Sequence, residues 1–181
     1  MPSRPAQPPL TVSNPALISD GGDGAFRQML HNLLAFSVRL EQIRSDFGAR
    51  IGLSGPQYTI LITIRQLGES GDVGVGRVAD HLALTPTFVT NETKKLTRLG
   101  VIDKRPDPDD LRRVKLTVTE AGEALLRQLA PVQQQINDQL FAPIDAARFP
   151  VLQALAAELR LSAEQALRLS DQLATAEEGA A

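Results

Sequence analysis

The feature that most constrains the fold is a change of hydrophobic period between residues 75 and 118. The segment "GVGRVADHLAL" places apolar residues at helical spacing, and "TPTFVTNETKKLTRLG" begins a second helix with Thr85 as N-cap and Pro86 in its first turn. Gly100 suits the left-handed residue that follows a helix. Beyond it, "VIDKR" and "RRVKLTV" alternate as strands do, on either side of "PDPDD". The pattern predicts a helix-turn-helix motif followed by a β-hairpin.

Two further helices are predicted before this motif. Residues 25–48 carry apolar side chains near the i, i+3, i+4, i+7 spacing of an amphipathic helix. The next helix begins after Ser54, with Pro56 in its first turn and Gln57 placed for a capping box, and it closes at Gly68. Residues 1–23 are rich in proline and end in "SDGGDG", so we expect a flexible arm there.

The chain after the hairpin is also predicted to be helical. A long helix begins near Thr119, and Pro131 should kink it or end its first segment. A last apolar region is compatible with one helix or with two, because Pro150 limits where it can begin and "SAEQ" at 162–165 can cap a fresh start. Its apolar residues are Leu152, Leu155, Leu159, Leu169 and Leu173.

Composition excludes several classes of chemistry. The chain has no cysteine, which rules out disulfides, thiolate ligands and cysteine nucleophiles. Its two histidines have no partners in the sequence that would suggest a metal site, and no Gly-rich phosphate loop is present. We therefore expect no enzyme activity, no cofactor and no metal. No apolar run approaches the roughly 20 residues of a membrane helix, and no signal peptide is apparent, which favours the cytoplasm.

Charge is distributed unevenly along the chain. Residues 75–115 carry nine basic and six acidic side chains, a net charge of +3, whereas the whole chain carries −2, so the remainder carries −5. All of the chain's lysines, Lys94, Lys95, Lys104 and Lys115, lie in this window. A basic segment on an acidic protein indicates a surface that faces a polyanion.

The segment "VADHLALTPTFVTNETKKLTRLGVIDKRPDPDDLRRVKLTVTEAG" resembles the winged helix-turn-helix core of the MarR family, the multiple antibiotic resistance regulators. The resemblance rests on V-A-x-x-L-x-L-T, L-x-x-L-G-V-I-x-K-R, D-P-x-D-x-R-R and L-x-V-T-x-A-G. It implies a mainly α fold with a small β-hairpin wing, flanked by N- and C-terminal dimerisation helices. It also implies a homodimer on a pseudo-palindromic operator in double-stranded DNA.

The second helix of the motif is the predicted recognition helix, since its N-terminal turns would lie deepest in the major groove. Its polar face can form hydrogen bonds with base edges and phosphates, while Val89, Leu96 and Leu99 are predicted to face the core. Asn91, Glu92 and Thr93 depart from the family's pattern, which has a basic and then aliphatic residues there. Glu92 can repel phosphate and needs a neighbour such as Lys95 or Arg77. The predicted contacts are Thr85, Thr87, Thr90, Asn91, Lys94 and Lys95.

The charged hairpin is the predicted wing. Asp110-Leu111-Arg112 matches the family's D-x-R element, in which the acid braces the loop and the arginine enters the minor groove. A narrow minor groove concentrates negative potential, and guanidinium is more weakly hydrated than ammonium. The predicted wing residues are Lys104, Arg105, Asp110, Arg112, Arg113 and Lys115.

The resemblance further implies a small anionic aromatic effector, bound between the dimerisation helices and the winged module. The residues that the first two helices can present together include apolar side chains and arginines that can pair with a carboxylate. They are Phe36, Arg39, Leu40, Arg44, Phe47, Gln57, Tyr58, Leu61 and Arg65.

The resulting hypothesis is a dimeric, ligand-responsive transcriptional regulator that represses its target. The alternative is a winged-helix dimer that binds a protein partner without specific DNA binding. The predicted segments are an arm at 1–23, an N-terminal dimerisation helix at 24–53, the DNA-binding domain at 54–118, C-terminal dimerisation helices at 119–176 and a tail at 177–181.

Overall fold

The structure, a computed structural model, describes residues 9–106 and 114–180. It contains a short 3-10 helix, Pro15–Leu17, and then α1 (Gly24–Arg50), α2 (Gly55–Gly68), α3 (Val75–Leu82) and α4 (Pro86–Arg98). The strands β1 (Ile102–Pro106) and β2 (Val114–Val118) follow, and then α5 (Glu120–Leu140) and α6 (Arg148–Ala180). The chain forms two compact units, Met1–Pro131 and Val132–Ala181.

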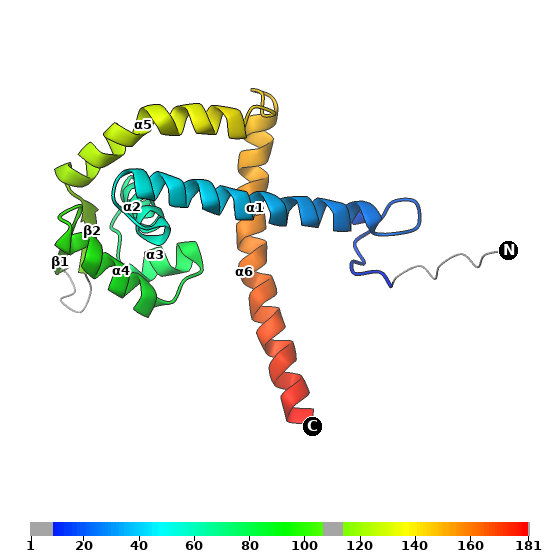
Figure 1. Cartoon of the computed structure of the whole chain (residues 1–181). Helices are drawn as coiled ribbons and strands as arrows, with labels where there is room; N and C mark the ends of the chain where they lie inside the picture. The colour runs from blue at the N-terminus through cyan, green and yellow to red at the C-terminus, as the bar shows by residue number, and fades with distance from the viewer. Residues whose placement is uncertain (1–8, 107–113, 181) are drawn as a thin grey trace. The chain divides into compact units, whose positions relative to one another are not determined.

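Helices α2, α3 and α4 and the hairpin form one cluster in the first unit (Figure 1). Its core is apolar, with side chains from α2, α3, α4 and both strands fully buried. Helix α1 packs on α2 through its C-terminal half, where Phe47 meets the ring of Tyr58 edge to face. The N-terminal half of α1 projects beyond this cluster (Figure 1). The predicted arrangement of a mainly helical protein with a two-stranded wing is confirmed.

The strands pair antiparallel, with Ile102 opposite Val118 and Lys104 opposite Leu116. The link before α3 contacts β2 through one backbone hydrogen bond, in which the Leu116 N–H donates to the Val73 carbonyl at 2.8 Å. Gly71, Gly74 and Gly76 surround Val73, so the sequence of this link carries no strand signal. Val73 is buried, so the link fixes the start of α3 against the hairpin.

Local signals at the helix ends act as predicted. Ser54 and Gln57 form the capping box of α2, and Thr85 caps α4 by accepting a hydrogen bond from the Phe88 N–H at 3.2 Å. Gly100 has φ of +72° and lets the chain turn back, so that the Val101 N–H reaches the Leu96 carbonyl at 3.2 Å.

One predicted core residue is exposed. Leu99 is 55% exposed, whereas sequence spacing placed it beside Val89 and Leu96 in the core. The reason is that α4 ends at Arg98, and the turn at Gly100 brings Val101 rather than Leu99 under the helix.

The C-terminal helices settle two predictions that the sequence left open. Helix α5 continues through Pro131 to Leu140, so the proline does not end it, although the boundary between the two compact units falls there. The last region is one helix, α6, with Pro150 in its first turn, where proline is tolerated. Neither these helices nor the others in residues 9–106 and 114–180 combine the length and apolarity needed to cross a membrane.

The described part of the arm is ordered around Asp23. Asp23 is buried, and its Oδ2 accepts hydrogen bonds from the Thr11 N–H at 2.7 Å and the Thr11 hydroxyl at 2.6 Å. Arg27 lies 2.7 Å from Oδ1 as an ion pair, without the alignment of a hydrogen bond. These contacts close a loop of the arm onto the start of α1.

The Thr11 hydroxyl, and then the Thr11 N–H and Arg27, lower the pKa of Asp23 below its usual 3.8, against the opposing effect of burial. A depressed pKa in the folded state stabilises the fold above pH of about 3.8, and this stabilisation is lost as pH falls through the folded pKa.

We expect the stability difference between the native protein and Asp23→Asn to vanish on acidification, as measured by thermal unfolding between pH 2 and 7. Asp20→Asn removes a negative charge at an exposed neighbour and is the control.

Gly122 allows α5 to lie close to the turn after α4. A Cβ at this position would collide with the Val101 carbonyl oxygen and lie 2.8 Å from Val118 Cγ1. Gly122→Ala should therefore cost about 1–3 kcal/mol of unfolding free energy, although alanine is the better helix former. Denaturant unfolding measures this cost. Gly76→Ala in α3 is the control, since open space surrounds Gly76 and the change should not destabilise.

Candidate nucleic-acid interface

The α3–α4 pair forms the helix-turn-helix. The turn is made by Ala83, which has φ of +52° in the left-handed region, and the Leu84 N–H donates to the Ala79 carbonyl at 2.9 Å. The sequence does not mark this turn residue, because alanine carries no signal for that conformation. Val78 and Ala79 of α3 are buried, and they hold the helix under α4.

The predicted recognition face is exposed on α4. Thr87, Asn91 and Lys94 are exposed and Thr90 is half-buried, while Val89 and Leu96 lie in the core on the opposite side. Thr87, Asn91 and Lys94 have no ion pair or side-chain hydrogen bond with any residue of the described ranges, so their polar groups are available to a ligand. The arrangement presents hydroxyl, amide and ammonium groups on one side of a helix whose other side is anchored.

Glu92 and Thr93 are buried in α4, a property that the sequence did not reveal. The Glu92 carboxylate accepts hydrogen bonds from Gln57 Nε2 at 3.2 Å and from Lys95 Nζ at 2.7 Å. Of the two neighbours named from the sequence, Lys95 is therefore the partner. Arg77 instead donates to the Asp72 carbonyl and to Ser70 Oγ. The only sequence signal was that an acid stands where the family's pattern has an aliphatic residue.

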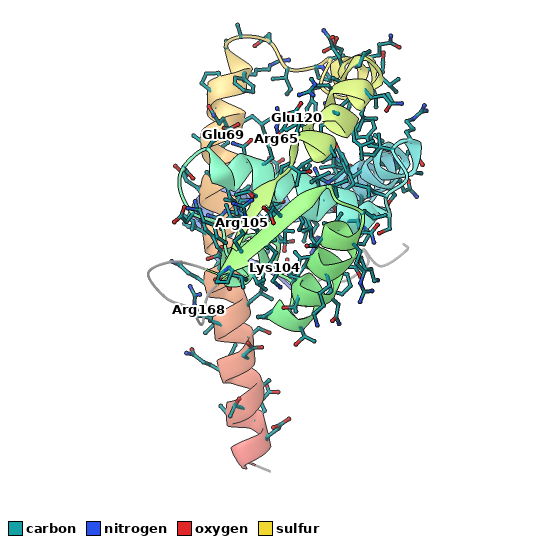
Figure 2. The ribbon with its side chains drawn as sticks, turned by 90° about the vertical axis from the view of Figure 1, so that its left-hand side faces the viewer. Arg65, Glu69, Lys104, Arg105, Glu120 and Arg168 are labelled. Atoms are coloured by element: carbon teal, nitrogen blue, oxygen red, sulfur yellow. The ribbon has the colours of Figure 1, made fainter. Side chains whose placement is uncertain are left out.

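Three of the predicted basic residues lie on the wing strands, and Arg105 stands opposite Lys115 in the register. Lys104 and Arg105 lie on β1, as Figure 2 shows, and Arg105 pairs with Asp103 at 2.6 Å. Lys115 on β2 forms an ion pair with Asp72. Asp110, Arg112 and Arg113 lie outside the described residues. The hairpin thus follows the recognition helix directly and carries basic side chains on both strands.

The residues predicted to bind an effector do not form one open site in the first unit. Phe47, Tyr58 and Leu61 are core residues of the α1–α2 contact, and burial raises the pKa of the Tyr58 hydroxyl. Arg44 lies over the Tyr58 ring, 5.7 Å from its centroid.

The other residues of this set lie apart from that core. Phe36 and Arg39 are exposed on α1, and Leu40 is half-buried there. Gln57 caps α2, and Arg65 pairs with Glu123 of α5 at 3.1 Å.

A hollow of about 620 Å³ lies instead within the second unit, where α5 ends and α6 begins. It contains none of the residues predicted for the effector. Its lining includes Phe141, Ile144, Phe149 and Leu152. Within the described part of the chain, no group of three or more His, Asp or Glu side chains is placed to hold a metal ion.

These features define a winged helix-turn-helix protein with a polar recognition helix and a basic wing. A profile of the MarR family matches residues 53–114. The uncharacterized HTH-type transcriptional regulator YhbI of Bacillus subtilis is 31% identical over 108 residues, which cover 60% of this chain and 68% of that protein. The chain therefore belongs to the MarR family of DNA-binding transcriptional regulators, and not to a family of enzymes.

More distant similarities extend to proteins with described activities. The HTH-type transcriptional repressor NicR of Pseudomonas putida is 26% identical over 93 residues, covering 50% of this chain and 59% of that protein. A mutant MarR from E. coli complexed with operator DNA has a TM-score of 0.59 and 17% identity, covering 73% of this chain and 93% of that one.

BpsR of Bordetella bronchiseptica, from a structure concerned with regulation of DNA binding by 6-hydroxynicotinic acid, has a TM-score of 0.58 and 23% identity. The match covers 73% of this chain and 98% of the BpsR chain. At these identities the two solved structures show a shared fold.

Thr85 and Thr87, both at the start of α4, are expected to have different roles, one in stability and one in DNA binding. Thr85→Ala should cost about 1 kcal/mol of unfolding free energy, because the Phe88 N–H loses its cap. Thr87→Ala should not lower stability, since the Thr87 hydroxyl forms no hydrogen bond with a described residue, and should weaken DNA binding instead. Denaturant unfolding and fluorescence anisotropy on DNA measure the two effects. Equal losses of stability would contradict the assignment of Thr87 to the exposed face.

Proposed function

We propose that the protein is a homodimeric repressor in the cytoplasm that binds a pseudo-palindromic operator. Helix α4 enters the major groove and the wing enters the minor groove. The observation that carries this proposal is the exposed face of Thr87, Asn91 and Lys94 on a helix anchored through Val89 and Leu96. Asn can pair with adenine N6 and N7, and Lys94 can contact guanine or phosphate. Arg112 of the wing is proposed to contact the minor groove.

Exposed apolar side chains support a homodimer. The N-terminal half of α1 exposes Met29, Leu30, Leu33 and Leu34, and α6 exposes Leu152, Leu155, Leu159, Leu169 and Leu173. Apolar surface of this extent is typical of a protein interface. We assign residues 24–53 and 119–176 to dimerisation and residues 54–118 to DNA binding. Light scattering should give twice the mass of 19.5 kDa at micromolar concentration, and a monomer mass would contradict the assignment.

The proposed effector is a small aromatic or anionic molecule that releases the protein from DNA. Support comes from the family and from the relation of BpsR to 6-hydroxynicotinic acid. A ligand shifts the protein away from DNA only by binding better to a dimer whose recognition helices are wrongly spaced for the operator. Titration calorimetry with aromatic acids tests this point. No heat, together with unchanged DNA affinity, would contradict it.

Selection from random duplex DNA should enrich an inverted repeat, because a two-fold dimer presents two recognition helices. Anisotropy on the enriched site should show that Lys94→Ala makes the slope of log K against log salt shallower by about 0.9, the contribution of one phosphate. Arg112→Ala should lose about 1 to 3 kcal/mol of binding free energy. No enrichment and a flat salt dependence would instead favour a winged-helix dimer that binds a protein partner.

A further inference from the structure

The two adjacent lysines of α4 have different surroundings. Lys94 is exposed and has no ion pair or hydrogen bond within the described ranges. Lys95 is also exposed, but its Nζ lies 2.7 Å from the Oε1 of Glu92, which is only 7% exposed. The charge of Lys95 is therefore balanced by a carboxylate of its own helix, and the charge of Lys94 is not.

Glu92 also connects two helices. Its Oε2 accepts a hydrogen bond from Gln57 Nε2 at 3.2 Å, and Gln57 Oε1 accepts one from the Ser54 N–H at 3.0 Å. A buried carboxylate is tolerated only where it is paired and hydrogen-bonded, and Glu92 has one partner on each oxygen. The carboxylate thus ties the middle of the recognition helix to the first turn of α2.

We propose that Glu92 is a positioning residue of the DNA interface, which withholds Lys95 from the DNA backbone and fixes α4 against α2. Lys95 follows Asn91 by one helical turn and lies beside the recognition face. A free ammonium at that position would neutralise a phosphate on any sequence and would raise non-specific binding. Glu92 thereby keeps sequence-independent affinity low and leaves base recognition to Thr87 and Asn91. The inference rests on the proposed function.

The first test is the salt dependence of binding to a random duplex, measured by anisotropy with the full-length protein. Glu92→Gln should steepen the slope by about 0.9, because it releases Lys95 to a phosphate. Glu92→Gln combined with Lys95→Ala should restore the slope of the native protein. An unchanged slope in Glu92→Gln, or no restoration in the double variant, would overturn the role of Glu92 in withholding Lys95.

The second test separates the link to α2 from the charge on Lys95. Gln57→Met removes the hydrogen bond to Glu92 and leaves the ion pair with Lys95. The ratio of operator affinity to random-duplex affinity should fall about tenfold, as expected for loss of a hydrogen bond to a charged group, with the salt slope unchanged. Ser54→Ala is the matched control, since it removes the other half of the capping box and keeps the Gln57–Glu92 contact.

Equal ratios in Gln57→Met and the native protein would overturn the link, and so would an equal fall in Ser54→Ala. This second test does not depend on whether Glu92→Gln folds. A native protein that shows no salt-dependent DNA binding would contradict the proposed function itself, whereas native binding with unaffected variants would contradict this inference alone.

Discussion

The turn at Gly100 and Val101 joins α4, the hairpin and α5, and the rest of the winged helix-turn-helix unit depends on it. The Val101 N–H donates to the Leu96 carbonyl, and the Val101 carbonyl accepts from the Thr119 N–H at 3.1 Å. The Thr119 hydroxyl donates to the Gly100 carbonyl at 2.6 Å. Because β1 begins directly after Val101, and β2 ends directly before Thr119, which is hydrogen-bonded to the turn, short backbone contacts as well as side-chain packing set the position of the wing relative to α4.

Helix α4, the proposed recognition helix, combines two kinds of anchor. Val89 and Leu96 bury apolar surface, which holds the helix in place without fixing its rotation strictly. Glu92 adds directional contacts to Gln57 and Lys95, and directional contacts do specify rotation. A helix that reads base edges requires such precision, because a hydrogen bond to a base is lost over a fraction of an ångström. The polar anchor therefore complements the apolar one.

Many apolar side chains of α1 and α6 are exposed, unlike those of the core. The winged unit buries most of its apolar residues, whereas α6 exposes leucines along most of its length. A helix with so much exposed apolar surface gains most of its stability from packing against another element. This difference in burial agrees with a winged helix-turn-helix unit that folds around its own core and with terminal helices that pack on another surface.

The sequence by itself determined the order of the elements and most of their ends. Ser54, Thr85 and Gly100 act through contacts with residues only a few positions away, so their effect is visible in the local sequence. The exposed face of Thr87, Asn91 and Lys94 follows from helical periodicity in the same way. The burial of Glu92, the exposure of Leu99 and the pairing of Val73 with β2 depend on contacts between α2, α4 and the hairpin. Only the tertiary structure decided these features, because local spacing does not state which distant element will cover a given side chain.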